Sequence, residues 1–197
     1  MKTIITLIFF GVLTYASEEK QKIQYGQSNC QGYRSMQNFT QTQFFQGIWS
    51  LTHSTPSTRV TASTICRDYE VTVHQNGTIQ VTYGYNENEC GNHYDVHCNG
   101  TENSDTKGVF NFDCHLYNGM EESQNTHIDV AFLATDYDNY CVVYRCVKID
   151  GNFVEDNVFI LYRPDKTNED YAKTLAEHYG LTIDNFISRK NASCTSR

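Results

Sequence analysis

Hydrophobic and polar residues alternate along most of this chain in short segments bounded by turn residues. Alternation with a period of two is typical of strands with one buried face, and Val, Ile, Tyr, Phe and Thr favour strands. Turns are predicted at four dipeptides: Asn76-Gly77, Asn99-Gly100, Asn118-Gly119 and Asp150-Gly151. Eight strands are predicted at residues 46–54, 64–73, 77–87, 91–99, 108–116, 126–135, 140–148 and 157–163.

The periodicity changes after Pro164, where a helix is predicted. Thr167 has the character of a helix N-cap, with Asp170 three residues later, and Gly180 is a natural C-terminal stop. Residues at helical spacing then form one apolar face, which we expect to pack on the outside of the strands: Tyr171, Leu175 and Tyr179.

The two ends of the chain differ in character. Residues 1–16 have the features of a secretory signal peptide, with Lys2 before a short apolar run and Ala16 at the expected cleavage site. Residues 17–43 are polar and Gln-rich, so we expect an extended N-terminal arm that is ordered mainly near Cys30. The remainder, residues 44–197, is predicted to form one domain.

Eight cysteines in an exported chain predict up to four disulfides, although their spacing does not fix the pairing. An exported protein can be N-glycosylated, and the sequence has four glycosylation sequons, at Asn38, Asn76, Asn99 and Asn191. The cysteines are residues 30, 66, 90, 98, 114, 141, 146 and 194.

The formal net charge of −8 becomes −9 when the signal peptide removes Lys2. An acidic surface repels nucleic acid and anionic membranes, so neither is an expected partner. It favours solubility, and it would also suit a basic protein partner. We expect a monomer.

Catalytic and metal-binding signatures are missing from the sequence, so no enzyme activity and no metal are predicted. There is no Gly-x-Ser-x-Gly elbow and no His-Glu-x-x-His helix, and Asp136 has the context of a turn residue. His93, Asp95 and His97 share one strand face, which suits zinc, but a solvated polar face is the preferred interpretation. No Cys-x-x-Cys pair is present.

Several motifs in a fixed order resemble the lipocalins, and within them the triabin and pallidipin-like salivary proteins of blood-feeding triatomine bugs. Gly47-Ile48-Trp49, Thr135-Asp136-Tyr137 and Arg163 carry the wider resemblance. The narrower one rests on residues 65–69, 133–140 and 185–190 together with Cys146 and Cys194. The resemblance implies an all-β fold: an eight-stranded antiparallel up-and-down barrel with a C-terminal helix outside it. It also implies that Trp49 packs under Arg163 at the barrel base.

The resemblance further implies three disulfides, Cys30–Cys146, Cys66–Cys194 and Cys98–Cys114. Cys90 and Cys141 are then left over, and they are expected at opposite ends of the barrel, too far apart to bond directly. The hairpin register offers another scheme, Cys90–Cys114 with Cys98–Cys141, and the sequence leaves both open.

In function, the resemblance implies a protein secreted in saliva that counters host haemostasis or inflammation by sequestering a small mediator in its barrel. Eicosanoids, biogenic amines and adenine nucleotides are the implied ligand classes. The alternative is a protein inhibitor of thrombin, another coagulation factor or platelet activation, acting through the barrel surface. Related nitrophorins bind haem through a histidine where this chain has Gly84, so no cofactor is expected, although His53 or His127 could substitute.

Strand parity suggests where a ligand would bind. If Cys66 and Cys146 point outward to meet the tails, then Arg67 and Arg145 point inward, because successive side chains alternate faces. Buried arginines suit a carboxylate, phosphate or sulfonate, so an amphipathic anion is the favoured ligand. The alternatives are an internal carboxylate partner or a position at a wet rim. The predicted ligand-binding residues are Arg67, Tyr69, Val71, Val73, Val143, Arg145 and Val147.

Overall fold

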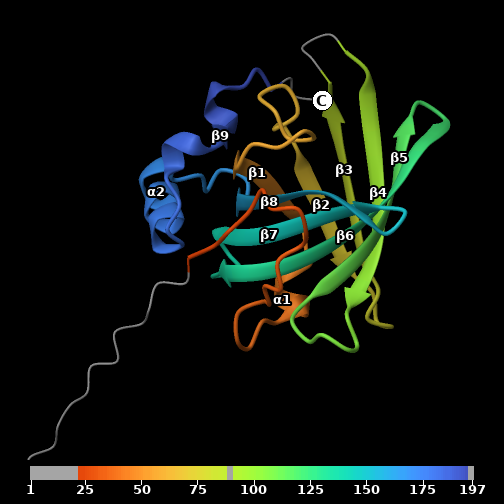
Figure 1. The fold of residues 1–197 in the computed structure, drawn as a ribbon, viewed down its shortest axis with the longest axis horizontal. Helices are drawn as coiled ribbons and strands as arrows, with labels where there is room; N and C mark the ends of the chain where they lie inside the picture. The colour runs from red at the N-terminus through yellow and green to blue at the C-terminus, as the bar shows by residue number, and fades with distance from the viewer. Residues whose placement is uncertain (1–21, 88–90, 195–197) are drawn as a thin grey trace, which may run out of the picture.

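Eight antiparallel strands close into an up-and-down barrel in the computed structural model, which describes residues 22–87 and 91–194 (Figure 1). The predicted signal peptide and Cys90 lie outside the described residues. Each strand pairs with the next in sequence, and pairing of β1 with both β8 and β2 closes the barrel. The strands are β1 Ile48–Ser54, β2 Asp68–Val73, β3 Ile79–Asn86, β4 His93–Glu102, β5 Phe110–Asn118, β6 Glu121–Thr135, β7 Tyr140–Ile149 and β8 Asn152–Tyr162. A two-residue strand, β9 Ile187–Ser188, adds to the edge of β1.

All eight predicted strands are present, but β6 and β8 each begin five residues earlier than predicted. The added part of β6 is mostly exposed and carries polar residues, so it shows no alternation to detect. The added part of β8 contains Glu155 and Asp156, which are charged and yet buried. A strand with buried charged residues is difficult to predict from hydrophobic periodicity, because charged residues occupy positions that are usually apolar.

Three of the four predicted turns are confirmed, and one is wrong. Gly77, Gly119 and Gly151 lie between strands with positive φ values of 83°, 65° and 76°. Asn99 and Gly100 instead lie inside β4. A Cβ at position 100 would lie 2.4 Å from both the Asn111 carbonyl oxygen and a ring carbon of Phe112, so this glycine permits a close approach within the sheet.

Aromatic residues close the barrel base, the lower end in Figure 1, where a short helix, α1 Gln41–Phe44, precedes β1. The Trp49 ring stacks on Phe44 at 4.8 Å between centroids, and its indole Nε1 donates to the Phe44 carbonyl at 3.1 Å. The Arg163 guanidinium lies 3.8 Å from the Trp49 ring centroid, as the resemblance implied. Arg163 also donates hydrogen bonds to the carbonyls of Tyr137 and Ile48 at 3.1 Å each, so it joins three chain segments.

The C-terminal helix, α2 Glu169–His178, packs outside the barrel, but two details of its prediction were wrong. The N-cap is Asn168, not Thr167, and its side chain accepts from the Tyr171 backbone N–H. Of the predicted apolar face, Leu175 and Tyr179 are buried as expected, but Tyr171 is 40% exposed, and Ala172 and Ala176 complete the buried face. This face packs in an outer core with Val142, Tyr144, Val158 and Ile160 of β7 and β8.

Gly180 ends α2 as predicted, with a φ of 71°. Its N–H donates to the Glu177 carbonyl at 3.0 Å, and the Leu181 N–H donates to the Ala176 carbonyl at 2.9 Å. These two bonds are those of a Schellman motif, which requires the left-handed backbone that glycine adopts without strain.

The described part of the N-terminal arm, residues 22–43, is attached at several points and not mainly near Cys30. The Ile23 N–H donates to the Tyr179 carbonyl at 3.1 Å. The Gly26 N–H donates to the Asp156 carboxylate at 2.6 Å, and the Gln31 N–H donates to the Tyr144 hydroxyl at 2.8 Å. The arm therefore follows the outer face of β7 and β8 because the sheet offers polar partners there.

Three disulfides join cysteines that sit in different parts of the chain: Cys30–Cys146, Cys66–Cys194 and Cys98–Cys114. The first two fasten the N-terminal arm and the C-terminal tail to the barrel, and the third links directly opposed positions of β4 and β5. The alternative pairing of Cys98 with Cys141 is therefore wrong. Cys141 is a buried free thiol, and burial raises its pKa well above the usual value.

None of the helices within residues 22–87 and 91–194 is both long enough and apolar enough to cross a membrane.

Replacing Arg163 with Ala should lower the free energy of unfolding by about 2–4 kcal/mol. The change removes a cation–π contact and charged hydrogen bonds to backbone carbonyls that the fold then leaves unsatisfied. Denaturant unfolding followed by Trp49 fluorescence measures the effect. Lys107→Ala is the control, because Lys107 is 74% exposed and pairs only with Glu102, so its loss should cost about 1 kcal/mol or less. Equal effects of the two substitutions would contradict this role of Arg163.

Candidate ligand cavity

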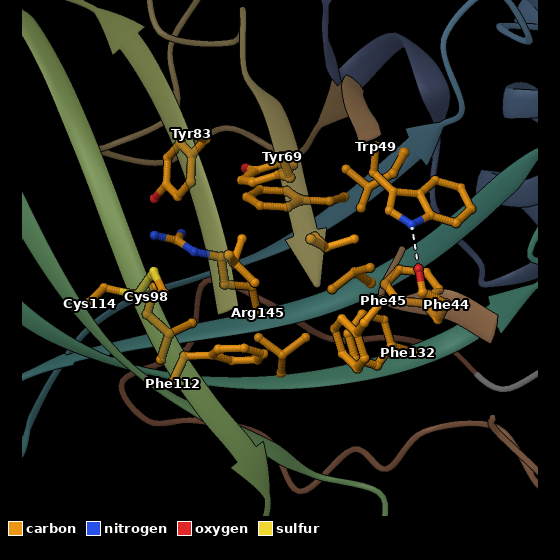
Figure 2. A pocket seen from close by; sticks show the side chains of 17 residues that line it. Phe44, Phe45, Trp49, Tyr69, Tyr83, Cys98, Phe112, Cys114, Phe132 and Arg145 are labelled. Atoms are coloured by element: carbon orange, nitrogen blue, oxygen red, sulfur yellow. Dashed lines mark hydrogen bonds between the residues drawn. A yellow bond between two sulfur atoms is a disulfide. The ribbon is translucent and has the colours of Figure 1, made fainter. Parts of the chain in front are cut away.

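A cavity of about 90 Å³ lies inside the barrel, above the aromatic base. Its wall is almost entirely apolar, and it brings together residues from α1 and from all eight barrel strands (Figure 2). The strands contribute because their inward positions alternate with outward ones. The lining residues are Phe44, Phe45, Trp49, Tyr69, Val71, Val81, Tyr83, Cys98, Phe112, Cys114, Ile128, Val130, Phe132, Val143, Arg145, Phe159 and Leu161.

Polar groups gather at one end of this cavity. Figure 2 shows the Arg145 side chain extending toward Tyr83, away from the cluster of Phe44, Phe45, Trp49 and Phe132. Arg145 is the one formally charged residue among those that line the cavity. The cavity is therefore amphipathic, with an aromatic floor and a cationic upper end.

Arg145 has an internal carboxylate partner, which was one of the alternatives at the sequence level. Its Nη1 donates to Glu155 Oε1 at 3.2 Å and to Asn157 Oδ1 at 3.0 Å. Burial by itself raises the pKa of Glu155, but the Arg145 charge and hydrogen bonds from Thr58, the Arg59 backbone and Ser57, between β1 and β2, lower it below its usual value. Glu155 is therefore ionised at neutral pH and neutralises Arg145.

Arg67 is also buried, with 2% of its surface exposed, but its surroundings differ. Its Nε donates to the Thr64 carbonyl at 2.7 Å, and its Nη2 donates to the Arg59 carbonyl. The guanidinium lies 4.6 Å from the Tyr85 ring centroid and 5.8 Å from that of Tyr83. No Asp or Glu of the described residues forms an ion pair with it, so its charge is held only by dipoles and aromatic faces.

Arg67 and Arg145 are both buried, in line with the inward direction that strand parity predicts. On β7, Val142, Tyr144 and Cys146 belong to the outer core, whereas Val143 and Val147 belong to the interior. Of the seven predicted ligand-binding residues, the cavity is lined by Tyr69, Val71, Val143 and Arg145. The other three are not part of its wall: Arg67 lies behind Tyr83, and Val73 and Val147 pack in the interior core. Burial raises the pKa of Tyr69 to about 12, so its hydroxyl stays protonated.

Two parts of the site were not predicted from the sequence. The aromatic floor of Phe44, Phe45, Phe112 and Phe132 comes from α1 and its C-cap residue, from β5 and from β6, and its members meet only through the barrel closure. Glu155 was missed because its strand was predicted to begin after it. The detectable signal was a charged pair, Glu155-Asp156, directly before an apolar strand.

The segment between β1 and β2, residues 55–67, covers the upper end of the barrel (Figure 1), and we call its residues 55–66 the mouth loop. Val60 and Ile65 of this loop are fully buried in the interior core. Thr58 and the Arg59 backbone donate to the Glu155 carboxylate. The mouth loop thus closes the barrel with apolar residues below and hydrogen bonds to β8.

The histidines considered as haem or metal ligands do not line the cavity. His53 Nε2 lies 3.1 Å from Glu169 of α2, on the outside of the barrel, and burial lowers its pKa. His127 lies between Asp113 and Asp129 at 2.9 and 3.1 Å on the outer face. Across the described residues, no group of three or more His, Cys, Asp or Glu is arranged to hold a metal ion.

Comparison with known proteins gives a consistent family and fold. The family model described as Triabin matches residues 18–175. Triafestin-2 of Triatoma infestans is 32% identical over 198 residues, covering 97% of this chain and 92% of that protein. Among solved structures, the tryptamine complex of the amine-binding protein of Rhodnius prolixus has a TM-score of 0.69 at 15% identity, covering 85% of this chain and 91% of the other.

A second solved structure is a protein in complex with leukotriene C4. Its TM-score is 0.55 at 25% identity, and the match covers 75% of this chain and 88% of the other. These neighbours share the barrel architecture with this chain.

Haem offered to the purified protein should give no sharp Soret band. Gly84 has no ligand atom, and neither His53 nor His127 faces the cavity. Absorbance titration with micromolar haemin measures this, with a haem-binding globin apoprotein as positive control. A stoichiometric, sharp Soret band would show that another side chain reaches an iron atom.

Proposed function

Because the chain belongs to the triabin family, we propose that it is a secreted salivary protein that sequesters a small amphipathic anion in its barrel. In this proposal the protein counters host haemostasis or inflammation by stoichiometric binding and not by turnover. An eicosanoid-like carboxylate is the favoured ligand, with its apolar part in the aromatic cavity and its anionic group on the arginines.

The observation that carries this proposal is the charge of the barrel interior. Arg67 and Arg145 are both buried, while Glu155 is the one carboxylate that pairs with either of them among the described residues. Two positive charges against one negative charge leave the interior short of an anion. Buried charge without a partner is costly, so an anionic ligand gains more here than a neutral one.

The same charge count disfavours a biogenic amine, because an ammonium group would add a third positive charge. The solved complex with leukotriene C4 supports an anionic mediator on a related barrel. Tyr83 lines the cavity, and the Arg67 guanidinium lies 5.8 Å from the centroid of its ring, so in this proposal Arg67 and Tyr83 supply donors to an anionic group that reaches past the cavity wall.

The cavity of about 90 Å³ is small for such a ligand. Sites for drug-sized molecules usually measure ~300–1,000 Å³. The cavity as it stands holds the end of an apolar chain, so a whole mediator requires the mouth loop or the tyrosines above the cavity to move.

Native mass spectrometry identifies the ligand class and separates this proposal from its alternative. The purified protein is incubated with an extract of activated platelets and then measured intact. A bound mass of a small acid supports sequestration. An unchanged mass together with slowed clotting of plasma would instead support inhibition of a coagulation factor through the acidic surface.

Replacing Arg67 with Gln should weaken binding of a long-chain carboxylic acid by roughly 10- to 150-fold, the worth of one charged hydrogen bond. Gln keeps donors for the Thr64 and Arg59 carbonyls while removing the charge. The methyl ester of the same acid should bind the unmutated protein more weakly than the acid does, and should lose little further affinity in the variant. Calorimetry of the four combinations gives the coupling energy directly.

Lys173→Ala is the matched control, because it removes one positive charge from the exposed face of α2. It should leave both affinities unchanged. If acid and ester bind the unmutated protein equally well, Arg67 does not recognise the anionic group and the cavity does not select for charge.

A further inference from the structure

Glu155 lies between the cavity arginine and the mouth loop, and its two carboxylate oxygens contact different partners. Oε1 accepts from Arg145 Nη1 at 3.2 Å. Oε2 accepts from Thr58 Oγ1 at 2.7 Å and from the Arg59 backbone N–H at 3.0 Å. The residue is only 6% exposed. One carboxylate therefore neutralises the cavity and fastens the loop that closes it.

Arg59 connects the mouth loop to the second buried arginine as well. Its carbonyl accepts from Arg67 Nη2, and its own guanidinium donates to Gln124 of β6. Two arginines are proposed to bind a ligand, and both are connected to Arg59. Arg67 bonds to it directly, and Arg145 is linked to it through Glu155. A group that draws either arginine away from these contacts also loosens the loop.

Resting on the proposed function, we infer that Glu155 determines the ligand specificity of the barrel: a ligand's anionic group replaces it on Arg145, and this exchange releases the mouth loop. A guanidinium presents a limited set of donors in a fixed plane, and two carboxylates on one side of it repel each other. A neutral ligand offers nothing that compensates Arg145 for losing Glu155. An anion therefore opens the barrel more readily than a neutral ligand does.

The exchange has a consequence for protons. Beside Arg145 the carboxylate is ionised at neutral pH, but once displaced it is buried next to a second negative charge, and both effects raise its pKa. Binding should therefore take up a proton, and affinity for an anion should increase as pH falls. The charged or titratable residues around Glu155 are Arg145 of β7 and Arg59 of the mouth loop, with Arg67, directly before β2, and Tyr69 of β2 interacting with each other and Tyr69 with Arg145. All four are arginines or tyrosine.

Two naphthalene dyes with the same ring system test the inference. 1-Anilinonaphthalene-8-sulfonate carries a sulfonate that stays ionised over this pH range, and N-phenyl-1-naphthylamine lacks it. Fluorescence titrations between pH 5.5 and 7.5 compare the unmutated protein, Glu155→Gln and the control Glu122→Gln. Glu122 is a surface carboxylate that pairs with His115, so its variant removes the same charge far from the cavity.

For the unmutated protein and Glu122→Gln, affinity for the sulfonate dye should rise as pH falls. For Glu155→Gln it should be roughly 10-fold higher at neutral pH and independent of pH, because the competing charge is gone. The neutral dye should bind all three proteins equally at every pH. The pH dependence of the unmutated protein needs no variant, so it tests the inference even if Glu155→Gln folds poorly.

Amide hydrogen exchange measures the release of the loop. The sulfonate dye should speed exchange in residues 55–66 of the unmutated protein, whereas the neutral dye should not. Preference for the sulfonate dye without a pH dependence or a change in loop exchange would overturn the role of Glu155 and leave the proposed function standing. Equal binding of the two dyes, or no binding of either, would overturn both.

Discussion

Burying two guanidinium groups in an apolar barrel is the constraint on which the rest of this structure depends. A charge removed from water is tolerated only where other groups replace its hydration. Arg145 obtains this from Glu155 and Asn157, and Arg67 obtains it from backbone carbonyls and tyrosine faces. These requirements fix the course of the mouth loop, because Thr58, Arg59 and Thr64 supply or share the partners. The burial of the two arginines and the closure of the mouth therefore depend on the same set of hydrogen bonds.

The two ends of the barrel are closed by different chemistry. At the base, Arg163 lies on Trp49 and bonds to backbone carbonyls beside a cluster of phenylalanines, which gives a rigid floor. At the mouth, Val60 and Ile65 are buried, and the start of the loop that carries them is attached to β8 by hydrogen bonds of Thr55 with Asn157 and Val158. Further along the loop, Thr58 and Arg59 are held by the carboxylate of Glu155. Any opening therefore belongs at this part of the mouth, where one exchange of partners frees Thr58 and Arg59.

Two of the three disulfides among the described residues lie outside the cavity, whereas Cys98–Cys114 is part of its wall. Cys30–Cys146 and Cys66–Cys194 hold the arm and the tail on the outside, and closing loops of 116 and 128 residues stabilises the fold by about 5 kcal/mol each on the chain-entropy model. Stability that comes from the outer surface does not depend on which side chains line the interior. Solved structures of the same barrel architecture hold chemically different ligands, tryptamine in one and leukotriene C4 in another.

The sequence by itself determined the strands, the outer helix and the inward direction of Arg67 and Arg145, because these follow from local periodicity and from parity along one strand. It did not determine which inward residues meet. The cavity collects side chains from α1 and eight strands, and only the barrel closure brings Phe45 of the N-terminal segment near Phe112 of β5. Glu155 illustrates the limit most clearly. Its sequence neighbourhood appears polar, and its role arises because the barrel places it between Arg145, ten residues away, and a loop almost a hundred residues away. Contacts between residues so far apart in the sequence depend on the strand register and tilt of the whole barrel. Neither can be predicted from a local sequence pattern.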